Sequence, residues 1–207
     1  MLTLLGNIMG IAERRQRHKE EIKKEIILTA WELVKKEGWQ SLSIRKIADA
    51  IEYSVPVIYD HFENKEAILL EFAKKGYYKL FKHMFEAKEQ HTDPAEQIKA
   101  MADAYWNFAH EHRELYQLMF GIGMACCEID KAVLEKEQFR AIFTEPIEQL
   151  VKKSERTDIN VCLKYHALWS LLHGLISIRI VGNTPLREGL DKMILDDAIQ
   201  GYLKNLS

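Results

Sequence analysis

The chain has 207 residues, of which 47% are hydrophobic and 29% are charged. This composition can fill a core and solvate a surface, which excludes a disordered chain, a collagen-like fibre and a disulfide-stapled miniprotein. Lysine and arginine number 29 against 31 aspartates and glutamates, a net charge of −2. Because no global positive field attracts nucleic acid, any nucleic-acid site has to be a local patch.

The cysteines and the apolar segments indicate the compartment. An odd number of cysteines, two of them adjacent, indicates a reducing compartment rather than a disulfide framework: Cys126, Cys127 and Cys162. The apolar residues 1–5 lack the charged region and the cleavage site of an export signal. The longest apolar stretch, about Ala167 to Ile178, is interrupted by His173 and flanked by charges, which predicts no membrane span. We therefore expect a soluble, cytoplasmic protein without a membrane partner.

Helical periodicity runs through most of the chain, and no stretch alternates as a strand does. Ser43, Ser54, Asn64 and Asp93 are predicted helix N-caps. The pattern predicts helices over about 22–37, 44–51, 55–62, 65–90, 98–110, 114–120, 131–153, 159–181 and 190–206. The predicted fold class is all-α, with a small N-terminal three-helix helix-turn-helix unit and a larger helical body.

The third predicted helix has one buried side and one free side. At about 100° per residue, Ile58 and Phe62 fall on one side. Pro56, Val57 and Asp60 point away from that side, and Tyr59 lies between the two. A helix anchored in this way presents its outer face as a recognition helix does in a major groove.

Further residues around this helix have the chemistry of phosphate contacts. Tyr59 and His61 can donate hydrogen bonds at its edge, and Lys65 adds a cation at the first turn of the next helix. Ser43 and Arg45, which open the second helix, can serve the opposite strand.

Two strings, SIRKIADA at 43–50 and SVPVIYDHFENKEAIL at 54–69, resemble the TetR family of bacterial repressors. The resemblance implies a homodimeric DNA-binding transcriptional regulator, typically a repressor that a small molecule releases from a pseudo-palindromic operator. It implies a basic extension at 1–19, a DNA-binding domain at 20–66 and a ligand-binding and dimerisation domain at 67–207. The implied DNA-binding residues are Ser43, Arg45, Ser54, Val55, Pro56, Val57, Tyr59, Asp60, His61 and Lys65.

The string departs from the family pattern at two positions. Glu52 stands where many members have glycine, so the turn must form without the residue that best tolerates a positive φ. Val57 stands where many have threonine or serine. Val55 and Val57 can meet thymine methyl groups, while Asp60 can accept from cytosine but repels phosphate. We expect few base-specific hydrogen bonds and a heavier reliance on backbone contacts.

A basic stretch precedes these helices. Six lysines and arginines stand against three glutamates from Glu13 to Lys24, whereas residues 1–75 together hold 13 basic and 12 acidic residues. The stretch is either an arm that follows phosphates or enters a minor groove, or a solvated, frayed terminus.

The body carries the implied effector and dimer sites. The helix at 159–182 is apolar nearly all round, and with 190–206 the family resemblance makes it a four-helix dimer interface. Trp169, His173 and Gly174, together with the segment 110–121, resemble the WHG subclass of TetR C-terminal domains. The family implies an unknown small-molecule effector, with these candidate lining residues, each of which can equally be plain core: Tyr105, Trp106, Met119, Phe120, Met124, Trp169 and His173.

No motif predicts an enzyme, a cofactor or a metal. The chain has no P-loop, dinucleotide fingerprint, nucleophile elbow or HExxH string. Five candidate ligands lack compact metal-binding spacing: His110, His112, Cys126, Cys127 and His173. The alternative function is an all-α small-molecule sensor with weakened DNA binding, which Val57, Asp60 and the nearly neutral N-terminal part favour.

Overall fold

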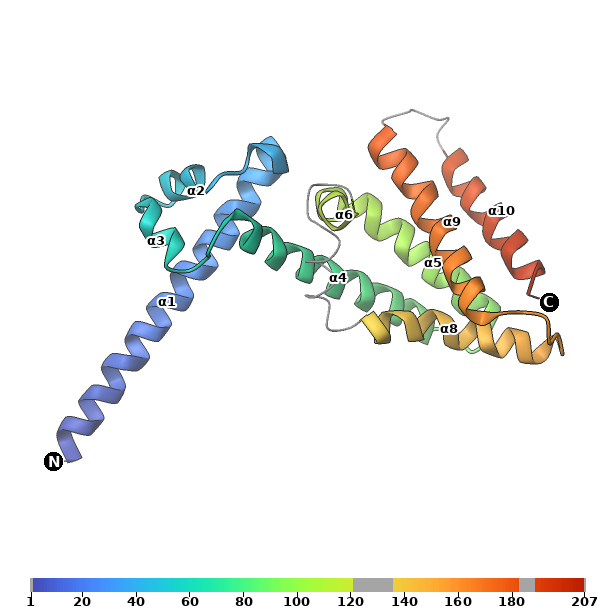
Figure 1. Cartoon of the computed structure of the whole chain (residues 1–207), viewed down its shortest axis with the longest axis horizontal. Coiled ribbons are helices and arrows are strands. Elements are labelled where there is room, and N and C mark those ends of the chain that lie inside the picture. The colour runs from blue at the N-terminus through green and yellow to red at the C-terminus, as the bar shows by residue number, and fades with distance from the viewer. Residues whose placement is uncertain (1, 121–135, 183–188, 207) are drawn as a thin grey trace. The chain divides into compact units, whose positions relative to one another are not determined.

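A computed structural model describes residues 2–120, 136–182 and 189–206, and within these ranges the chain is helical and contains no strand (Figure 1). The all-α fold class is confirmed. The elements are α1 (Leu2–Glu37), the 3-10 helix η1 (Trp39–Ser41), α2 (Ile44–Ala50), α3 (Val55–Tyr59), α4 (Lys65–Glu89), α5 (Pro94–Glu111), α6 (Arg113–Phe120), α8 (Lys136–Lys153), α9 (Val161–Gly182) and α10 (Leu190–Lys204). Met124, Cys126, Cys127 and the interhelical segment 183–185 lie outside the described residues.

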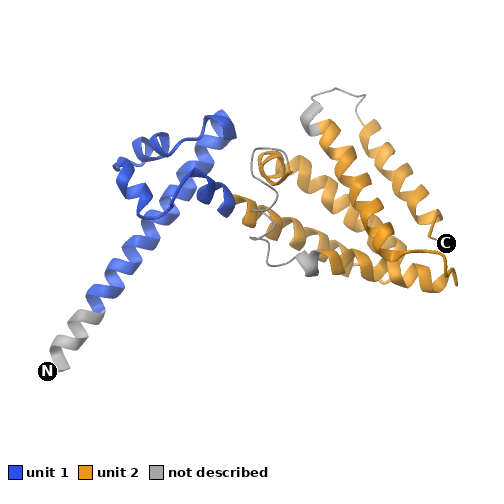
Figure 2. Ribbon diagram, viewed as in Figure 1, with its two compact units in different colours: residues 1–71 blue, residues 72–207 orange. Residues whose placement is uncertain are grey.

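Two compact units make up the chain, residues 1–71 and residues 72–207 (Figure 2). The helix α4 starts in unit 1 and continues into unit 2 without a break.

Unit 1 is built on one face of α1. Ile22, Ile26, Ala30 and Val34 recur at helical spacing and are buried. The helix ends at Gly38, whose φ of 79° suits a residue without Cβ and whose N–H donates to the Val34 carbonyl at 2.8 Å. The helix is longer than the periodic pattern predicts, because residues 10–21 continue it without a buried face.

The helix-turn-helix elements follow their capping signals in part. Ser43 caps α2 by accepting from the Lys46 N–H at 3.2 Å. Ser54 is the N-cap residue of α3, as predicted, but its hydroxyl makes no capping hydrogen bond. The helix α3 is also shorter than predicted, because it ends at Tyr59 and the chain turns at residues 60–61. Glu52 makes the preceding turn with a φ of 57°, a conformation that an L-residue adopts only at a cost.

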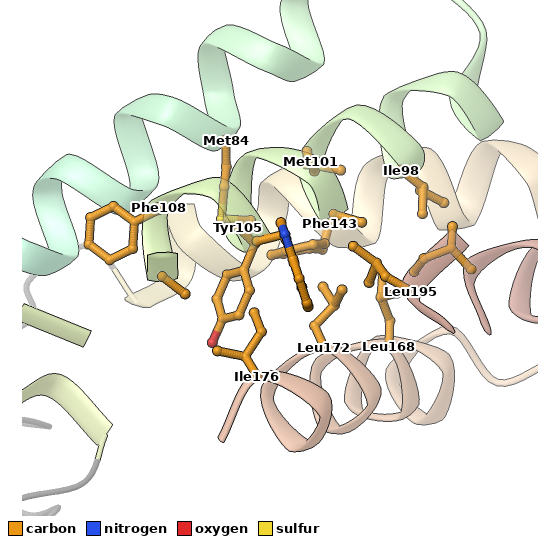
Figure 3. Close-up of a cluster of buried hydrophobic side chains, with 14 of the residues drawn as sticks. Met84, Ile98, Met101, Tyr105, Phe108, Phe143, Leu168, Leu172, Ile176 and Leu195 are labelled. Atoms are coloured by element: carbon orange, nitrogen blue, oxygen red, sulfur yellow. The ribbon is translucent and has the colours of Figure 1, made fainter. Parts of the chain in front are cut away.

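Unit 2 is a helical bundle in which α5 packs against α6, α8, α9 and α10. Asp93 starts α5 by accepting from the N–H groups of Ala95 and Glu96, at 2.9 and 3.2 Å. Figure 3 shows the core, where side chains from α4, α5, α8, α9 and α10 meet: Met84, Ile98, Met101, Tyr105, Phe108, Phe143, Leu168, Leu172, Ile176 and Leu195. The buried ammonium group of Lys88 in α4 pairs with Glu145 in α8.

The helix α9 buries only part of its apolar surface. Leu168, Leu172 and Ile176 face the core at four-residue intervals, whereas Leu163 and Ile178 are 66% and 63% exposed. By length and composition alone, the window Val161–Arg179 could cross a membrane, because the helix extends beyond the apolar stretch at 167–178. Length and composition are weak grounds for a span, since the core helix of a soluble bundle meets both.

One close approach joins α4 to α6. A methyl group at Gly76 would lie 2.6 Å from the Met119 sulfur, and Met119 is buried. Tyr77 reinforces the contact by donating from its hydroxyl to the Met119 carbonyl at 3.2 Å. A side chain at position 76 would therefore force the buried Met119 side chain to shift.

We expect Gly76→Ala to destabilise unit 2. Overpacking costs about 1–3 kcal/mol and exceeds the gain of up to about 1 kcal/mol that alanine brings to a helix. Gly201→Ala is the matched control, since nothing lies within 4 Å of its added methyl group. Urea unfolding should show a lower midpoint for Gly76→Ala and an equal or higher midpoint for Gly201→Ala. An unchanged midpoint for Gly76→Ala would mean that the contact is not tight.

Candidate nucleic-acid interface and effector site

The helix α3 is held from one side and open on the other. Ile58 and Phe62 are 0% and 5% exposed, whereas Pro56, Tyr59 and Asp60 are exposed. Tyr59 keeps 53% of its surface free. The orientation that helical spacing predicts for this face is the one in the structure.

Val55 and Val57 are half-buried rather than fully exposed. Both side chains are therefore shared between the unit and its outer face. Their remaining surface leaves them able to meet apolar base edges, but with less area than the sequence suggests.

The turn before α3 adds a side chain that sequence reasoning passed over. Tyr53 is 37% exposed and lies directly before Ser54, with its N–H donating to the Ala48 carbonyl at 3.0 Å. A turn residue gives no periodic signal, and only its backbone bond shows that it is held in place.

Of the two cations of α2, Lys46 has an ion-pair partner among the described residues and Arg45 has none. Lys46 pairs with Glu37 at 2.7 Å, and this hydrogen bond lowers the pKa of the Glu37 carboxyl. Arg45 on the same helix is exposed. The guanidinium of Arg45 is thus better placed than Lys46 to meet a phosphate.

His61 and Lys65 are less free than the sequence predicts. His61 is half-buried, and its Nδ1 is buried without a hydrogen-bond partner among the described residues. Burial, followed by the charge of Lys19, lowers the pKa of His61, so the imidazole is neutral near pH 7. The ammonium group of Lys65 donates to the Trp39 carbonyl at 3.4 Å, and Asn64 caps α4 through the Ala67 N–H at 2.8 Å.

In unit 2, four of the predicted effector-site residues lie together. Tyr105 and Trp169 meet edge to face at 5.4 Å between ring centroids. Phe120 lies 4.7 Å from the His173 ring and 6.0 Å from Trp169. Trp169 and His173 are stacked with an interplanar angle of 1°. Helices α5, α6 and α9 thus supply one aromatic cluster.

A chain of hydrogen bonds runs through this cluster. The hydroxyl of Tyr116 lies 2.8 Å from His173 Nδ1. The hydroxyl of Tyr105 lies 3.3 Å from the Tyr116 hydroxyl and 3.3 Å from His173 Nδ1. On the other side of the ring, Ser177 Oγ lies 3.3 Å from His173 Nε2. Burial raises the pKa of both tyrosines, so they stay protonated and one can donate to neutral His173.

Sequence reasoning missed Tyr116 and Ser177 as members of the cluster. A signal existed for each, because Ser177 lies one helical turn beyond His173 and Tyr116 lies within the segment 110–121 that resembles the WHG subclass. Neither spacing reveals that α5, α6 and α9 converge.

Two further predicted residues are buried in the same core with other contacts. The Trp106 ring lies tilted against the His110 ring, with 4.2 Å between centroids, and Met119 lies against Gly76. Met124 lies outside the described residues. Within residues 2–120, 136–182 and 189–206, no group of three or more histidines, cysteines or carboxylates could hold a metal ion.

Two family models match the chain. Residues 26–72 match the model described as bacterial regulatory proteins of the tetR family. Residues 98–200 match the model described as the tetracyclin repressor-like C-terminal domain. The finer resemblance of the body to the WHG subclass stays a prediction.

Individual relatives agree with these matches. The HTH-type transcriptional activator FasR of Mycolicibacterium smegmatis is 24% identical over 102 residues, 49% of this chain and 47% of FasR. The HTH-type transcriptional regulator YobS of Bacillus subtilis is 27% identical over 152 residues, 73% of this chain and 75% of YobS. The match thus spans about half the length of FasR and three quarters of YobS.

A solved structure shares the fold. The TetR family transcriptional regulator PfmR from Thermus thermophilus superposes with a TM-score of 0.65 at 20% identity, over 86% of this chain and 97% of that one. Together the two family models cover more than half of the sequence, and their order is that of the two units. The chain therefore belongs to the TetR family of transcriptional regulators.

Proposed function

We propose that the protein is a homodimeric, ligand-responsive repressor that binds a pseudo-palindromic operator in the cytoplasm. DNA binding is assigned to residues 20–66, and effector binding and dimerisation to 67–207. The observation that carries the proposal is the outer face of α3, where Tyr59 is half exposed directly beside buried Ile58. A regulator of this family needs such a face to enter a groove.

The DNA contacts divide by chemistry. Ser54, Val55, Pro56 and Val57 begin α3 and face the bases, with Asp60 at its end. Phosphate contacts fall to the side chains that flank this helix, through hydroxyl, guanidinium, imidazole Nε2 and ammonium groups: Ser43, Arg45, Tyr59, His61 and Lys65.

A free apolar face on α9 supports dimerisation. Leu163, Ala167, Gly174 and Ile178 lie on one side of the helix at spacings of four, seven and four residues. A methyl group at Gly174 would meet nothing within 4 Å, so this side is open in the single chain. On α10, Met193 is 67% exposed. A second copy of the chain would cover these exposed apolar side chains, and a two-fold pair would match a palindromic site.

The aromatic cluster supports an effector site with a planar or apolar ligand. Its rings supply apolar contact area, and the pair Tyr116 and His173 supplies one oriented polar interaction. A ligand with a hydrogen-bonding group near His173 would compete with Tyr116 for the imidazole.

The cluster is joined to α4 by direct contacts. Phe120 touches His173 on one side and Tyr77 of α4 on the other, at 4.7 and 5.6 Å between ring centroids. Met119, the residue before Phe120, lies against Gly76, the residue before Tyr77. A ligand that moves α6 must therefore move or repack α4, whose first residues belong to unit 1. Release follows if the ligand prefers the conformation that binds DNA poorly.

The alternative, a sensor with weakened DNA binding, is favoured by Asp60 and by the neutral His61. It predicts tight ligand binding without retardation of the protein's own promoter region at low salt. A genome-wide selection of bound DNA, repeated with candidate effectors, separates the two and identifies the operator.

We expect Tyr59→Phe to weaken operator binding by on the order of tenfold, because one hydrogen bond to a charged phosphate is lost per subunit. The salt dependence should stay the same, since the hydroxyl carries no charge. Lys65→Ala should instead flatten the salt slope by about one unit per subunit. Fluorescence anisotropy at several salt concentrations measures both.

Tyr78→Phe is the control for Tyr59, because Tyr78 is 59% exposed and lies on α4 in unit 2. Melting temperatures check Lys65→Ala, whose ammonium group also holds the Trp39 carbonyl. Wild-type affinity in both Tyr59→Phe and Lys65→Ala would remove the proposed contacts.

The double variant Leu163→Glu and Ile178→Glu should dissociate the dimer at micromolar concentration, because it places two charges in each half of an apolar interface. Sedimentation velocity measures the mass. Leu28→Glu is matched to Leu163→Glu, since both leucines are 66% exposed, and it should leave the dimer intact. A dimeric double variant, or a monomeric wild type, would contradict the interface.

We expect stability to fall as the pH drops from about 7 to 5. Burial lowers the pKa of His173 in the folded chain, so below about 6.5 the unfolded chain binds more protons. His173→Asn keeps an acceptor for Tyr116 and should flatten this dependence, whereas His91→Asn on the surface should not. Urea unfolding at fixed protein concentration measures it. Equal slopes in wild type and His173→Asn would show that His173 is not a source of the dependence.

A further inference from the structure

The first half of α1 carries a row of cations on a single face. Arg15, Lys19 and Lys23 follow one another at four-residue intervals, each about 40° around the helix from the last. Gln16 lies beside them, and we call these four residues the Lys19 stripe. Arg15, Gln16 and Lys19 are exposed, and Lys23 is half-buried.

The stripe contains no acidic residue. Glu13, Glu20 and Glu21 lie about 100° or more around α1 from Lys19, but Glu20 borders the stripe, because its carboxylate accepts from the Gln16 amide at 3.0 Å. The stretch from Glu13 to Lys24, with six lysines and arginines against three glutamates, is thus divided by the helix into a cationic face, which Glu20 borders, and a mixed face.

The stripe continues the face that α1 buries. Ile26 and Ala30, both 0% exposed, lie within about 20° of Lys19 around the helix. Toward the N-terminus the same face is open, and Ile11, Ala12, Arg15, Gln16 and Lys19 border a shallow hollow on it. In Figure 1 this part of α1 extends past α3.

The stripe begins at the end of the recognition helix. The Lys23 ammonium group lies over the Phe62 ring, 5.6 Å from its centroid. After burial, which is the largest cause, the charges of Lys19 and Lys23 lower the pKa of His61, directly after α3, whereas those of Asp60 and Glu20 raise it. Within the described residues, neither Arg15 nor Lys19 makes an ion pair, so both cations are available to an outside anion.

We propose that the Lys19 stripe binds phosphates of the duplex that flanks the base pairs read by α3. The proposal rests on the proposed DNA binding and extends it beyond the helix-turn-helix. From Arg15 to Lys23 the row is about 12 Å long, which matches several phosphates of one strand at about 3.4 Å of rise each. Cations without base-reading geometry add affinity and salt dependence rather than sequence preference.

The test uses the full chain and two duplexes obtained by selection of bound DNA, one trimmed to the two half-sites and one with one helical turn of flanking sequence on each side. Arg15→Gln with Lys19→Gln removes two stripe charges. Arg14→Gln with Arg17→Gln is the matched control, since it removes the same charge from the same helix about 140–160° away from Lys19.

The stripe variant should bind the flanked duplex on the order of tenfold more weakly than wild type, with a salt slope smaller by about 2 to 4 for a dimer. On the trimmed duplex it should match wild type, and the control variant should match wild type on both. Circular dichroism should show equal helix content in all three proteins.

Three results would refute the proposed DNA contact of the Lys19 stripe. Equal losses in the stripe and control variants would mean a general charge effect. A stripe variant that binds both duplexes like wild type, while Tyr59→Phe weakens both, would refute the stripe and leave the proposed DNA binding standing. Loss of binding to vesicles of phosphatidylglycerol and phosphatidylcholine, with DNA binding unchanged, would assign the stripe to a membrane surface. Failure of wild type to bind any duplex would instead refute the proposed function itself.

Discussion

The DNA-binding face depends on the burial of two side chains under a helix of five residues. A helix as short as α3 has no stability of its own, because nucleation costs more than its few hydrogen bonds return. Ile58 and Phe62 fix it in the unit, and their burial fixes which residues point outward. Tyr59 is exposed because its neighbour is buried. Pro56 in the first turn presets the backbone without losing a helical bond.

Charge acts in this chain through placement rather than amount. Unit 1 is nearly neutral along its sequence, yet α1 gathers Arg15, Lys19 and Lys23 on one face, with Glu20 at its edge. Pairing removes other cations from the surface, as Glu37 does for Lys46 and Glu145 does for Lys88. The few cations left without partners therefore set the local field, which is what a phosphate meets within a Debye length.

In the body, His173 organises a small polar network within a mainly apolar core. His173 joins Tyr116 and Ser177 through its two ring nitrogens, and burial favours the neutral form of the ring. Around it the packing is contiguous from α9 through α6 to α4, and the contact at Gly76 leaves no slack. Because protein cores are close-packed, a displacement at one of these contacts is passed to its neighbours.

The sequence by itself determined the helical fold, most helix bounds and the caps at Ser43, Asn64 and Asp93, because these follow from periodicity and local hydrogen bonding. It also determined the outward face of α3, since a 3.6-residue repeat fixes opposite sides. Only the tertiary structure decided that Val57 is half-buried, that Lys65 is engaged by Trp39 and that Tyr116 meets His173. These facts depend on contacts between residues far apart in the chain, which no local pattern encodes.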